Sequence, residues 1–225
     1  MIGRFALACL DMAGTTVRDD GAVEAAFTSA LAAVGITPGS RFFEEAQAFV
    51  RQTMGWSKAD VFATLLEPDE AKEATRAFAD AYEAIVATGD VSEIPGALEV
   101  LRQLRAAGVR VCLTTGFAPS TRDALLDALG WQAEVDLALS PADVGRGRPA
   151  PDLILGAMDR LGVDDPHAVA VVGDTGSDLE AGNAAGAGAV VGVLSGAHDE
   201  AGLVAAAPTA IIADVTRLIP LLRQV

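Results

Sequence analysis

The strongest constraint on the fold is an alternation of strand and helix patterns that begins after Pro95. From there to the end of the chain, short apolar runs typical of buried strands are separated by segments with helical spacing of apolar residues. The expected strands lie at residues 109–113, 137–139, 169–172, 189–194 and 210–213. Because strand–helix alternation leads to right-handed crossovers, the sequence predicts a parallel sheet with helices on both faces.

A further apolar run at residues 5–11 predicts one more strand, but a long helical block separates it from the others. Four helices are expected in this block, at about residues 25–34, 42–50, 57–66 and 69–87. Since the first strand must pair with the later ones, the block is an insertion. The predicted fold class is α/β, with a Rossmann-like parallel sheet core of residues 1–17 and 96–225 and an inserted all-helical domain over residues 18–95.

Composition narrows the range of partners. The 225 residues are 51% hydrophobic and carry a net charge of −15, which would repel a nucleic acid or an anionic membrane. A small anionic molecule could still bind through local cations or a metal ion. We expect no transmembrane helix and no signal peptide, because no apolar run has the required length or position. Cys9 and Cys112 lie in apolar runs, so free thiols in a cytoplasmic protein are expected.

Polar side chains gather in four loops that adjoin the predicted strands. These loops contain Asp11, residues 114–116, residues 146–151 and residues 173–178. In parallel sheets, ligands bind beyond the carboxyl ends of the strands. The four loops are therefore expected to line one crevice that forms the functional site.

Three carboxylates in these loops suggest a metal site. Asp11, Asp174 and Asp178 would repel one another in one crevice unless a cation lay among them. Hard oxygen ligands of this kind suit Mg²⁺, so we expect a magnesium cofactor, with the backbone carbonyl of Ala13 as a further ligand. The alternative role for Asp174 and Asp178 is helix N-capping, because Asp is favoured at helix starts.

Phosphate binding is expected from two of the loops. The Thr115 hydroxyl, with Gly116 allowing close backbone approach, suits a phosphoryl group. Arg148 supplies a fixed cation for a phosphoryl oxygen. The alternatives are an ordinary turn for Thr115 and a surface position for Arg148, and a surface position is also expected for Arg146.

These motifs, in this order over residues 5 to about 186, resemble those of the haloacid dehalogenase superfamily. The resemblance implies that Asp11 is a nucleophile that forms an aspartyl-phosphate. It also implies that the helical insertion is the cap of this superfamily. The superfamily pattern Asp-x-Asp-Gly-Thr has its general acid at the second Asp, where this chain has Ala13. Either the enzyme is impaired, or its leaving group needs no proton from that position. The second alternative points to a reaction other than ordinary ester hydrolysis.

The other superfamily motifs imply roles for the remaining candidates. By resemblance, Thr115 and Arg148 bind the phosphoryl group. Asp174 is a Mg²⁺ ligand, and Asp178 supports it. A haloacid dehalogenase proper is disfavoured because its chemistry needs no metal.

A lysine in the inserted block is the remaining candidate. Ser57 and Asp60 have the spacing of a capping box, which places Lys58 in the first turn of a helix. The helix dipole and burial under the cap are expected to lower the pKa of Lys58. A neutral amine can form a Schiff base with a carbonyl substrate. The alternative is a solvated cation at a helix end, the role that we assign to Lys72.

Cleavage of a C–P bond would account both for the lysine in the cap and for the absence of an acid at position 13. An iminium on the carbon next to the C–P carbon accepts the electron pair, so no acid is needed at position 13. Residues 11–16 and 54–58 resemble the matching motifs of phosphonoacetaldehyde hydrolases, or phosphonatases, in which the lysine forms the Schiff base. That resemblance also implies homodimers formed through the caps.

Two positions depart from the phosphonatase pattern. Val61 stands where the family has a His that assists proton transfer, and Gly21 stands where it often has a Cys. The two histidines of the chain, His167 and His198, are interpreted as surface residues.

The expected function is thus that of a Mg²⁺-dependent phosphonatase-like hydrolase. It would act on phosphonoacetaldehyde or a related small phosphonate through Asp11 and Lys58. The first alternative is a phosphatase of a small phosphomonoester. The second is a non-catalytic ligand-binding protein that kept the fold, which the intact carboxylates argue against.

Overall fold

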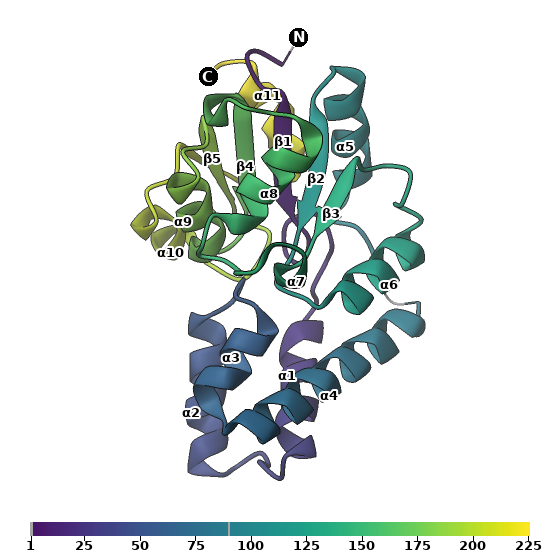
Figure 1. Ribbon diagram of the computed structural model, residues 1–225, viewed down its shortest axis with the longest axis vertical. Coiled ribbons are helices and arrows are strands. Elements are labelled where there is room, and N and C mark those ends of the chain that lie inside the picture. Colours follow the sequence, from purple (N-terminus) through teal and green to yellow (C-terminus); the bar gives the residue numbers. More distant parts are fainter. Residues whose placement is uncertain (1, 90) are drawn as a thin grey trace.

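A computed structural model describes residues 2–89 and 91–225, and within them a six-stranded parallel sheet forms the centre of the molecule (Figure 1). Its strands lie in the order β3-β2-β1-β4-β5-β6, so the first strand is central. They are β1 (Leu7–Asp11), β2 (Arg110–Thr114), β3 (Leu137–Leu139), β4 (Val169–Gly173), β5 (Ala189–Val193) and β6 (Ala210–Ile212). The predicted α/β class is confirmed, and every expected strand is present.

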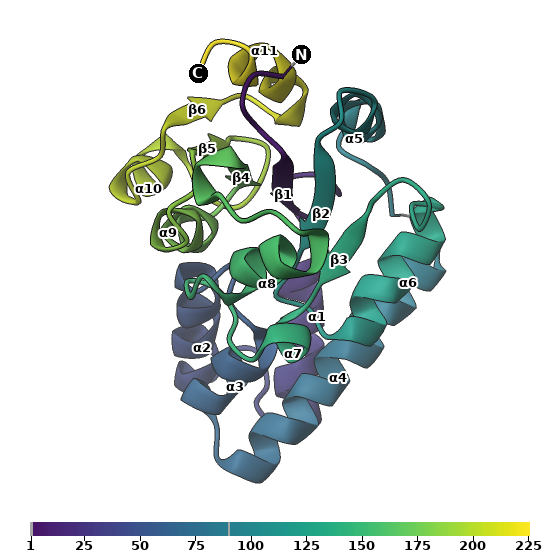
Figure 2. The same cartoon turned by 45° about the horizontal axis from the view of Figure 1, so that its top comes forward.

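The sheet is covered on both faces (Figure 2). Successive side chains of β1 point to opposite sides. Leu7 and Cys9 pack on the side covered by α8 (Asp152–Leu161) and α9 (Gly176–Ala184), in one apolar cluster. Ala8 and Leu10 belong to the other cluster, which includes α5 (Ala97–Ala106) and α11 (Leu218–Leu222). Burial on both faces explains why these strands read as continuous apolar runs.

The inserted helices form a second body beyond the carboxyl ends of the strands (Figure 1). They are α1 (Ala22–Ala33), α2 (Arg41–Gln52), α3 (Lys58–Leu65) and α4 (Pro68–Ala87), and we call them the cap. The cap has an aromatic centre, in which the ring of Phe27 lies 5.1 Å from that of Phe62 and 4.8 Å from that of Phe78. Three helices of the cap thus meet at one cluster.

The two linkers between the cap and the core run side by side. The backbone nitrogen of Arg18 donates to the carbonyl of Ser92 at 3.0 Å, and that of Ile94 donates to the carbonyl of Thr16 at 2.9 Å. The chain therefore leaves the core and returns to it at neighbouring points. The predicted domain boundaries fall within these linkers and stay a prediction.

Several helices were not expected from the sequence. They include α5 and α11, together with the short α7 (Pro141–Val144) and α10 (Glu200–Ala205). By contrast, α6 (Pro119–Leu129) follows β2 as predicted. In the described part of the chain, none of the helices combines the length and apolar character needed to cross a membrane.

Candidate active site

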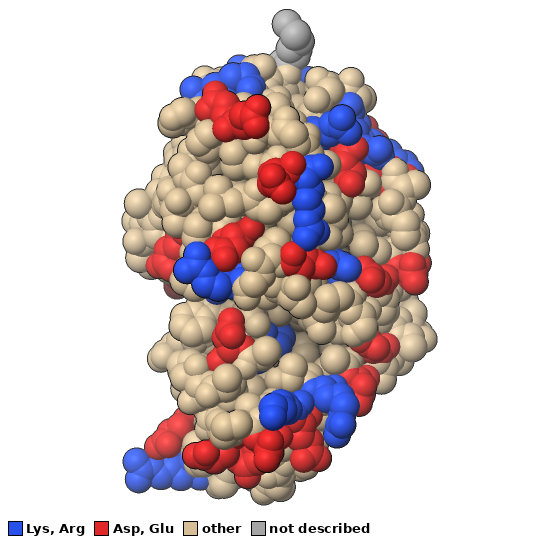
Figure 3. Space-filling model, in the orientation of Figure 1, with Lys and Arg blue, Asp and Glu red and all other residues tan. Residues whose placement is uncertain are grey.

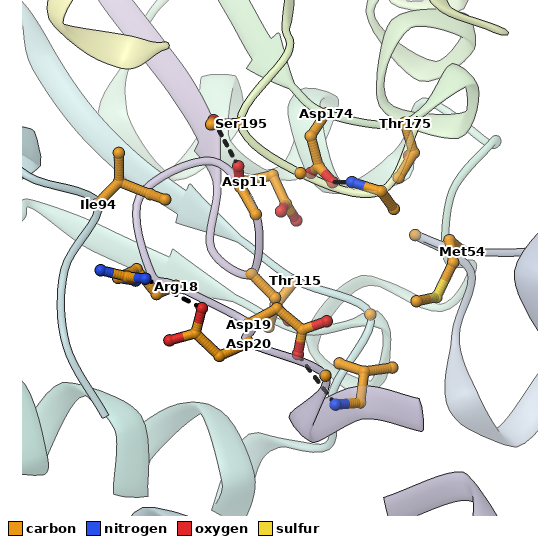
Figure 4. A pocket seen from close by; sticks show the side chains of 18 of the residues that line it. Asp11, Arg18, Asp19, Asp20, Met54, Ile94, Thr115, Asp174, Thr175 and Ser195 are labelled. Atoms are coloured by element: carbon orange, nitrogen blue, oxygen red, sulfur yellow. Dashed lines mark hydrogen bonds and ion pairs between the residues drawn. The ribbon is translucent and has the colours of Figure 1, made fainter. Parts of the chain in front are cut away.

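A cavity of about 640 Å³ lies where the carboxyl ends of the strands meet the cap (Figure 4). The core contributes Asp11, Thr115, Arg148 and Asp174 to its lining, and the cap contributes Lys58. Four loops and a cap helix that are far apart in the sequence therefore share one space. This is the crevice that the strand-end loops predict.

Asp11 ends β1 and is buried, with 5% of its surface exposed. The Nη1 atom of Arg148 donates to Asp11 Oδ1 at 2.6 Å and also to Asp178 Oδ1. The Nε atom of Arg148 is buried without a hydrogen-bond partner. Arg148 is thus a buried cation beside the predicted nucleophile, and the alternative of a surface arginine is wrong. Arg146 is the surface residue of this loop and pairs with Asp152 at 2.8 Å.

Asp11, Asp174 and Asp178 form a compact acidic cluster, in which one oxygen of each lies within 4.8 Å of the others. Burial first, and then the charge of Asp11, raise the pKa of Asp174 to about 7. Asp174 is held by the backbone nitrogen of Ala197 at 2.7 Å and by the hydroxyl of Thr15 at 3.1 Å. Buried carboxylates this close favour a cation among them, and an all-oxygen donor set fits Mg²⁺.

The two acidic residues of the α9 loop differ in their local roles. Asp178 completes a capping box with Thr175, so helix capping holds for Asp178 in addition to its place in the cluster. Asp174 precedes the helix and binds Thr15 and Ala197 instead. Ala13 lines the same cavity, and the use of its carbonyl as a ligand stays a prediction.

Thr115 and Gly116 follow β2 and both line the cavity. The Thr115 hydroxyl accepts a hydrogen bond from the backbone nitrogen of Phe117 at 3.1 Å, which is the turn role considered above. Gly116 lies against the cap, because a Cβ there would be 2.2 Å from the carbonyl oxygen of Trp56. Its own carbonyl accepts from the backbone nitrogen of Lys58 at 3.1 Å. Phosphate binding by both residues remains a prediction.

Lys58 begins α3 and is buried, so it is not the solvated cation of the alternative interpretation. Its Nζ lies 5.5 Å from the ring centres of Phe27 and Phe117, and 5.9 Å from that of Phe78. Burial first, and then the charge of Arg148, lower the pKa of Lys58 to about 8, although nearby carboxylates oppose this shift. The expected lowering is present, with burial as its main cause.

The predicted capping box at the start of α3 is wrong in one respect. Ser57 occupies the N-cap position, but its side chain makes no capping hydrogen bond. The backbone nitrogen of Lys58 instead donates to Gly116 of the core. A core carbonyl therefore satisfies one backbone donor, that of Lys58, in the first turn of this cap helix.

Two residues near the site have roles that the sequence interpretation missed. His198 is half-buried, and its Nδ1 accepts from the backbone nitrogen of Gly176 at 3.0 Å, so the surface interpretation is wrong for it but holds for His167. Asp19 lines the cavity and binds the backbone of α1. Among the described residues, no histidine lines the cavity, and Val61 is buried in the apolar core.

Comparison with known proteins agrees with this architecture. A family model described as haloacid dehalogenase-like hydrolase matches residues 5–186. The hydrolase from Pseudomonas syringae superposes with a TM-score of 0.85 at 25% identity, covering 98% of this chain and 99% of that one.

Two relatives align along most of their length. A protein named probable phosphatase IndB from Dickeya dadantii is 31% identical over 211 residues, covering 92% of this chain and 88% of its own. Phosphonoacetaldehyde hydrolase from Latilactobacillus sakei is 32% identical over 199 residues, covering 78% of this chain and 71% of its own. The match to the enzyme of that name from Bacteroides fragilis spans 41% of its length. The chain therefore belongs to the haloacid dehalogenase-like hydrolase family, in its phosphonatase-like branch.

Proposed function

We propose that this hydrolase cleaves the C–P bond of phosphonoacetaldehyde or a related small phosphonate aldehyde. The observation that carries the proposal is a buried lysine amine of lowered pKa in one cavity with Asp11. Ala13 adds to it, because a carbon leaving group stabilised by an iminium needs no acid at that position. The free buried cysteines are in keeping with a cytoplasmic enzyme. Pairing into homodimers through the caps stays a prediction.

Lys58 supplies the electron sink in this proposal. Its neutral amine attacks the aldehyde carbon, water leaves, and an iminium forms. The carboxylate of Asp11 then attacks phosphorus while the C–P bond breaks. The bonding pair moves toward the iminium and leaves an enamine on Lys58. Protonation and hydrolysis of the enamine release acetaldehyde, and water cleaves the aspartyl-phosphate to release phosphate.

The core residues bind the phosphoryl group in this proposal. Arg148 donates to Asp11, which supports a role for it in binding a phosphoryl oxygen beside the attacking carboxylate. Thr115 and Gly116 offer a hydroxyl and a backbone amide at the next strand end. Asp11, Asp174 and Asp178, with the carbonyl of Ala13, would hold Mg²⁺, which when bound screens the charge between two anions.

The cap closes this site over the core. The backbone nitrogen of Lys58 is tied to Gly116, and the hydroxyl of Ser177 donates to the carbonyl of Met54 at 3.3 Å. In this proposal, these contacts hold the lysine over the strand ends, and closure of the cap would exclude bulk water from phosphoryl transfer.

A phosphatase of small phosphomonoesters is the second candidate. It is favoured by the probable phosphatase that aligns over 88% of its own length. The buried Val61, which leaves the lysine without the neighbouring histidine of phosphonatases, also favours it. In that case, Lys58 would bind charge rather than form a covalent bond.

The deciding experiment is an assay of acetaldehyde and phosphate release from phosphonoacetaldehyde with Mg²⁺. Borohydride trapping is run in parallel, followed by mass spectrometry. The proposal predicts equal release of both products and a reduced adduct on Lys58. Lys58→Arg should abolish both signals, whereas Lys72→Arg is a matched control because Lys72 is exposed and pairs with Asp69 at 3.3 Å. Phosphate release from phosphomonoesters that Lys58→Arg leaves unchanged, with no adduct, would support the phosphatase instead.

A further inference from the structure

Asp19 lies at the entry to α1, and its carboxylate lines the cavity (Figure 4). Its Oδ1 accepts a hydrogen bond from the backbone nitrogen of Val23 at 2.9 Å. Its own carbonyl accepts from the backbone nitrogen of Ala22 at 2.6 Å. The first bond fixes the carboxylate against the first turn of the helix, and the second fixes the backbone of Asp19 there. The second oxygen, Oδ2, makes no hydrogen bond in the described part of the structure.

Asp19 and Lys58 act on each other electrostatically. The carboxylates that raise the pKa of Lys58 against its burial belong to Asp11, Asp19 and Asp174. Burial raises the pKa of Asp19, and the Val23 hydrogen bond and the charge of Lys58 partly offset that rise. Asp11 and Asp174 have other tasks in the proposed reaction, as nucleophile and metal ligand. Asp19 is therefore the carboxylate near Lys58 that is left to exchange protons.

The other acidic groups of the cavity are less suited to this task. Asp20 is exposed and pairs with Arg18 at 3.2 Å. Asp214 accepts from the backbone nitrogen of Thr216 at 2.9 Å and caps the turn that follows it. Glu24 is exposed on α1. None of the three is among the groups that shift the pKa of Lys58.

We propose that Asp19 is the acid–base group for Schiff-base chemistry at Lys58, an inference that rests on the proposed function. The Asp19 carboxylate takes one proton from the Lys58 ammonium, which leaves a neutral amine. The amine nitrogen bonds to the aldehyde carbon, and the carbonyl oxygen takes a second proton from the same nitrogen. Asp19 then returns its proton to the resulting hydroxyl, which departs as water. The iminium keeps the third ammonium proton, so protons and charge balance.

The arrangement of the two residues is compatible with these proton-transfer steps. Lys58 and Asp19 line the same cavity, yet the described structure contains no ion pair between them. The Asp19 carboxylate is therefore not already bound to the amine, and both groups face the cavity that would hold the substrate. A direct ion pair would instead hold the lysine as an ammonium ion and close that space.

The test compares Asp19→Asn and Asp19→Ser with wild type. Asn and Ser can both accept the Val23 hydrogen bond, so the start of α1 is kept while the titrating group is lost. The measured quantity is the rate at which the borohydride-trapped adduct forms on Lys58 with phosphonoacetaldehyde. Loss of general acid–base catalysis should slow this rate about 100-fold in both variants. Asp20→Asn is the matched control and should leave the rate unchanged.

The outcomes of this test distinguish a failure of the Asp19 role from a failure of the proposed function. Adduct formation at the wild-type rate in a folded Asp19 variant would overturn the role of Asp19 and leave the proposed function standing. Absence of an adduct in the wild type itself would overturn the proposed function and, with it, this inference. Thermal melting of each variant establishes that it is folded.

Discussion

The ammonium form of Lys58 is disfavoured because the side chain is buried in the protein interior. Burial, and then Arg148, lower its pKa from 10.5 to about 8. Between these two values, the unfolded chain binds a proton at this lysine that the folded chain has released. Stability therefore rises as the pH rises from about 8 toward 10.5. Below this window, the folded protein retains the cost of the buried charge, which is at most about 3.5 kcal/mol at ~1.4 kcal/mol per pKa unit.

Lys58→Met should therefore stabilise the protein near pH 7 by up to about 3.5 kcal/mol while abolishing the Schiff base. The gain should shrink as the pH approaches 10.5, because the folded wild type then holds a neutral amine. Urea unfolding at several pH values measures this difference. The matched control is Lys72→Met, at an exposed position, where no pH-dependent gain is expected. A Lys58→Met protein that is less stable than wild type at pH 7 would contradict the account.

The site residues that the sequence predicted best are reactive polar residues located at or near the ends of predicted strands. Asp11 ends β1 and Asp174 directly follows β4, and strand ends meet at one edge of a parallel sheet. Arg148 lies farther along, in the loop between α7 and α8. Asp19 and His198 lie in linking segments whose path depends on packing, so no local pattern showed where they point. The capping hydrogen bond expected from Ser57 is absent, and the backbone nitrogen of Lys58 donates to a core carbonyl that is distant in sequence, a contact that no local pattern shows.

At the scale of elements, the contact between the loop after β2 and α3 sets the position of the lysine. Gly116→Ala would place a Cβ 2.2 Å from the carbonyl oxygen of Trp56 and force the cap backbone away. Since misplacement by about 1 Å can cost 100-fold in rate, a loss of that order is expected on phosphonoacetaldehyde. Steady-state kinetics measure it.

The matched control for that variant is Gly202→Ala in α10, where the nearest atom to the new Cβ is 3.4 Å away. Activity should be unchanged there. Wild-type activity in Gly116→Ala would mean that the cap position seen here does not matter for turnover.

Most elements with strong periodicity were predicted, but α5 was missed although its buried residues Val100, Leu101 and Leu104 have helical spacing. The strands and α1–α4 follow from apolar runs and helical spacing in the sequence. The C-terminal α11 has five residues, Leu218–Leu222, which is too short for a periodic signal. It is held by the sheet cluster that it covers, where Leu218 and Leu222 are buried, and this tertiary contact is invisible in a local pattern.

The whole molecule has a net charge of −15, and its charged side chains are arranged differently on the surface and in the interior. Figure 3 shows acidic and basic side chains interspersed on the outer face. Inside, by contrast, three carboxylates are gathered in one buried cluster. Arg148 pairs with Asp11 and Asp178 of this cluster, whereas Asp174 has no ion-pair partner among the described residues, so a divalent cation is expected to bind at the interior cluster.

Magnesium should therefore stabilise the folded state as a whole. At a Mg²⁺ concentration about 100 times the Kd, stabilisation is about 2.7 kcal/mol, a rise in Tm of roughly 5–10 °C for a chain of this size. Asp174→Asn should remove most of this rise, whereas Asp159→Asn, at an exposed position on α8, should retain it. Thermal unfolding with and without Mg²⁺ measures both. An equal rise in both variants would place the bound ion elsewhere.

Because the two linkers lie side by side, the cap joins the core at a single place and could be exchanged for another domain. Its two ends meet at adjoining residues, where Arg18 is bonded to Ser92 and Ile94 to Thr16. A different lid with ends at the same spacing could be exchanged there without altering the register of β1 or the position of its terminal carboxylate. Substrate range can thus diversify in evolution, or in the laboratory, by lid exchange while phosphoryl transfer chemistry is inherited intact.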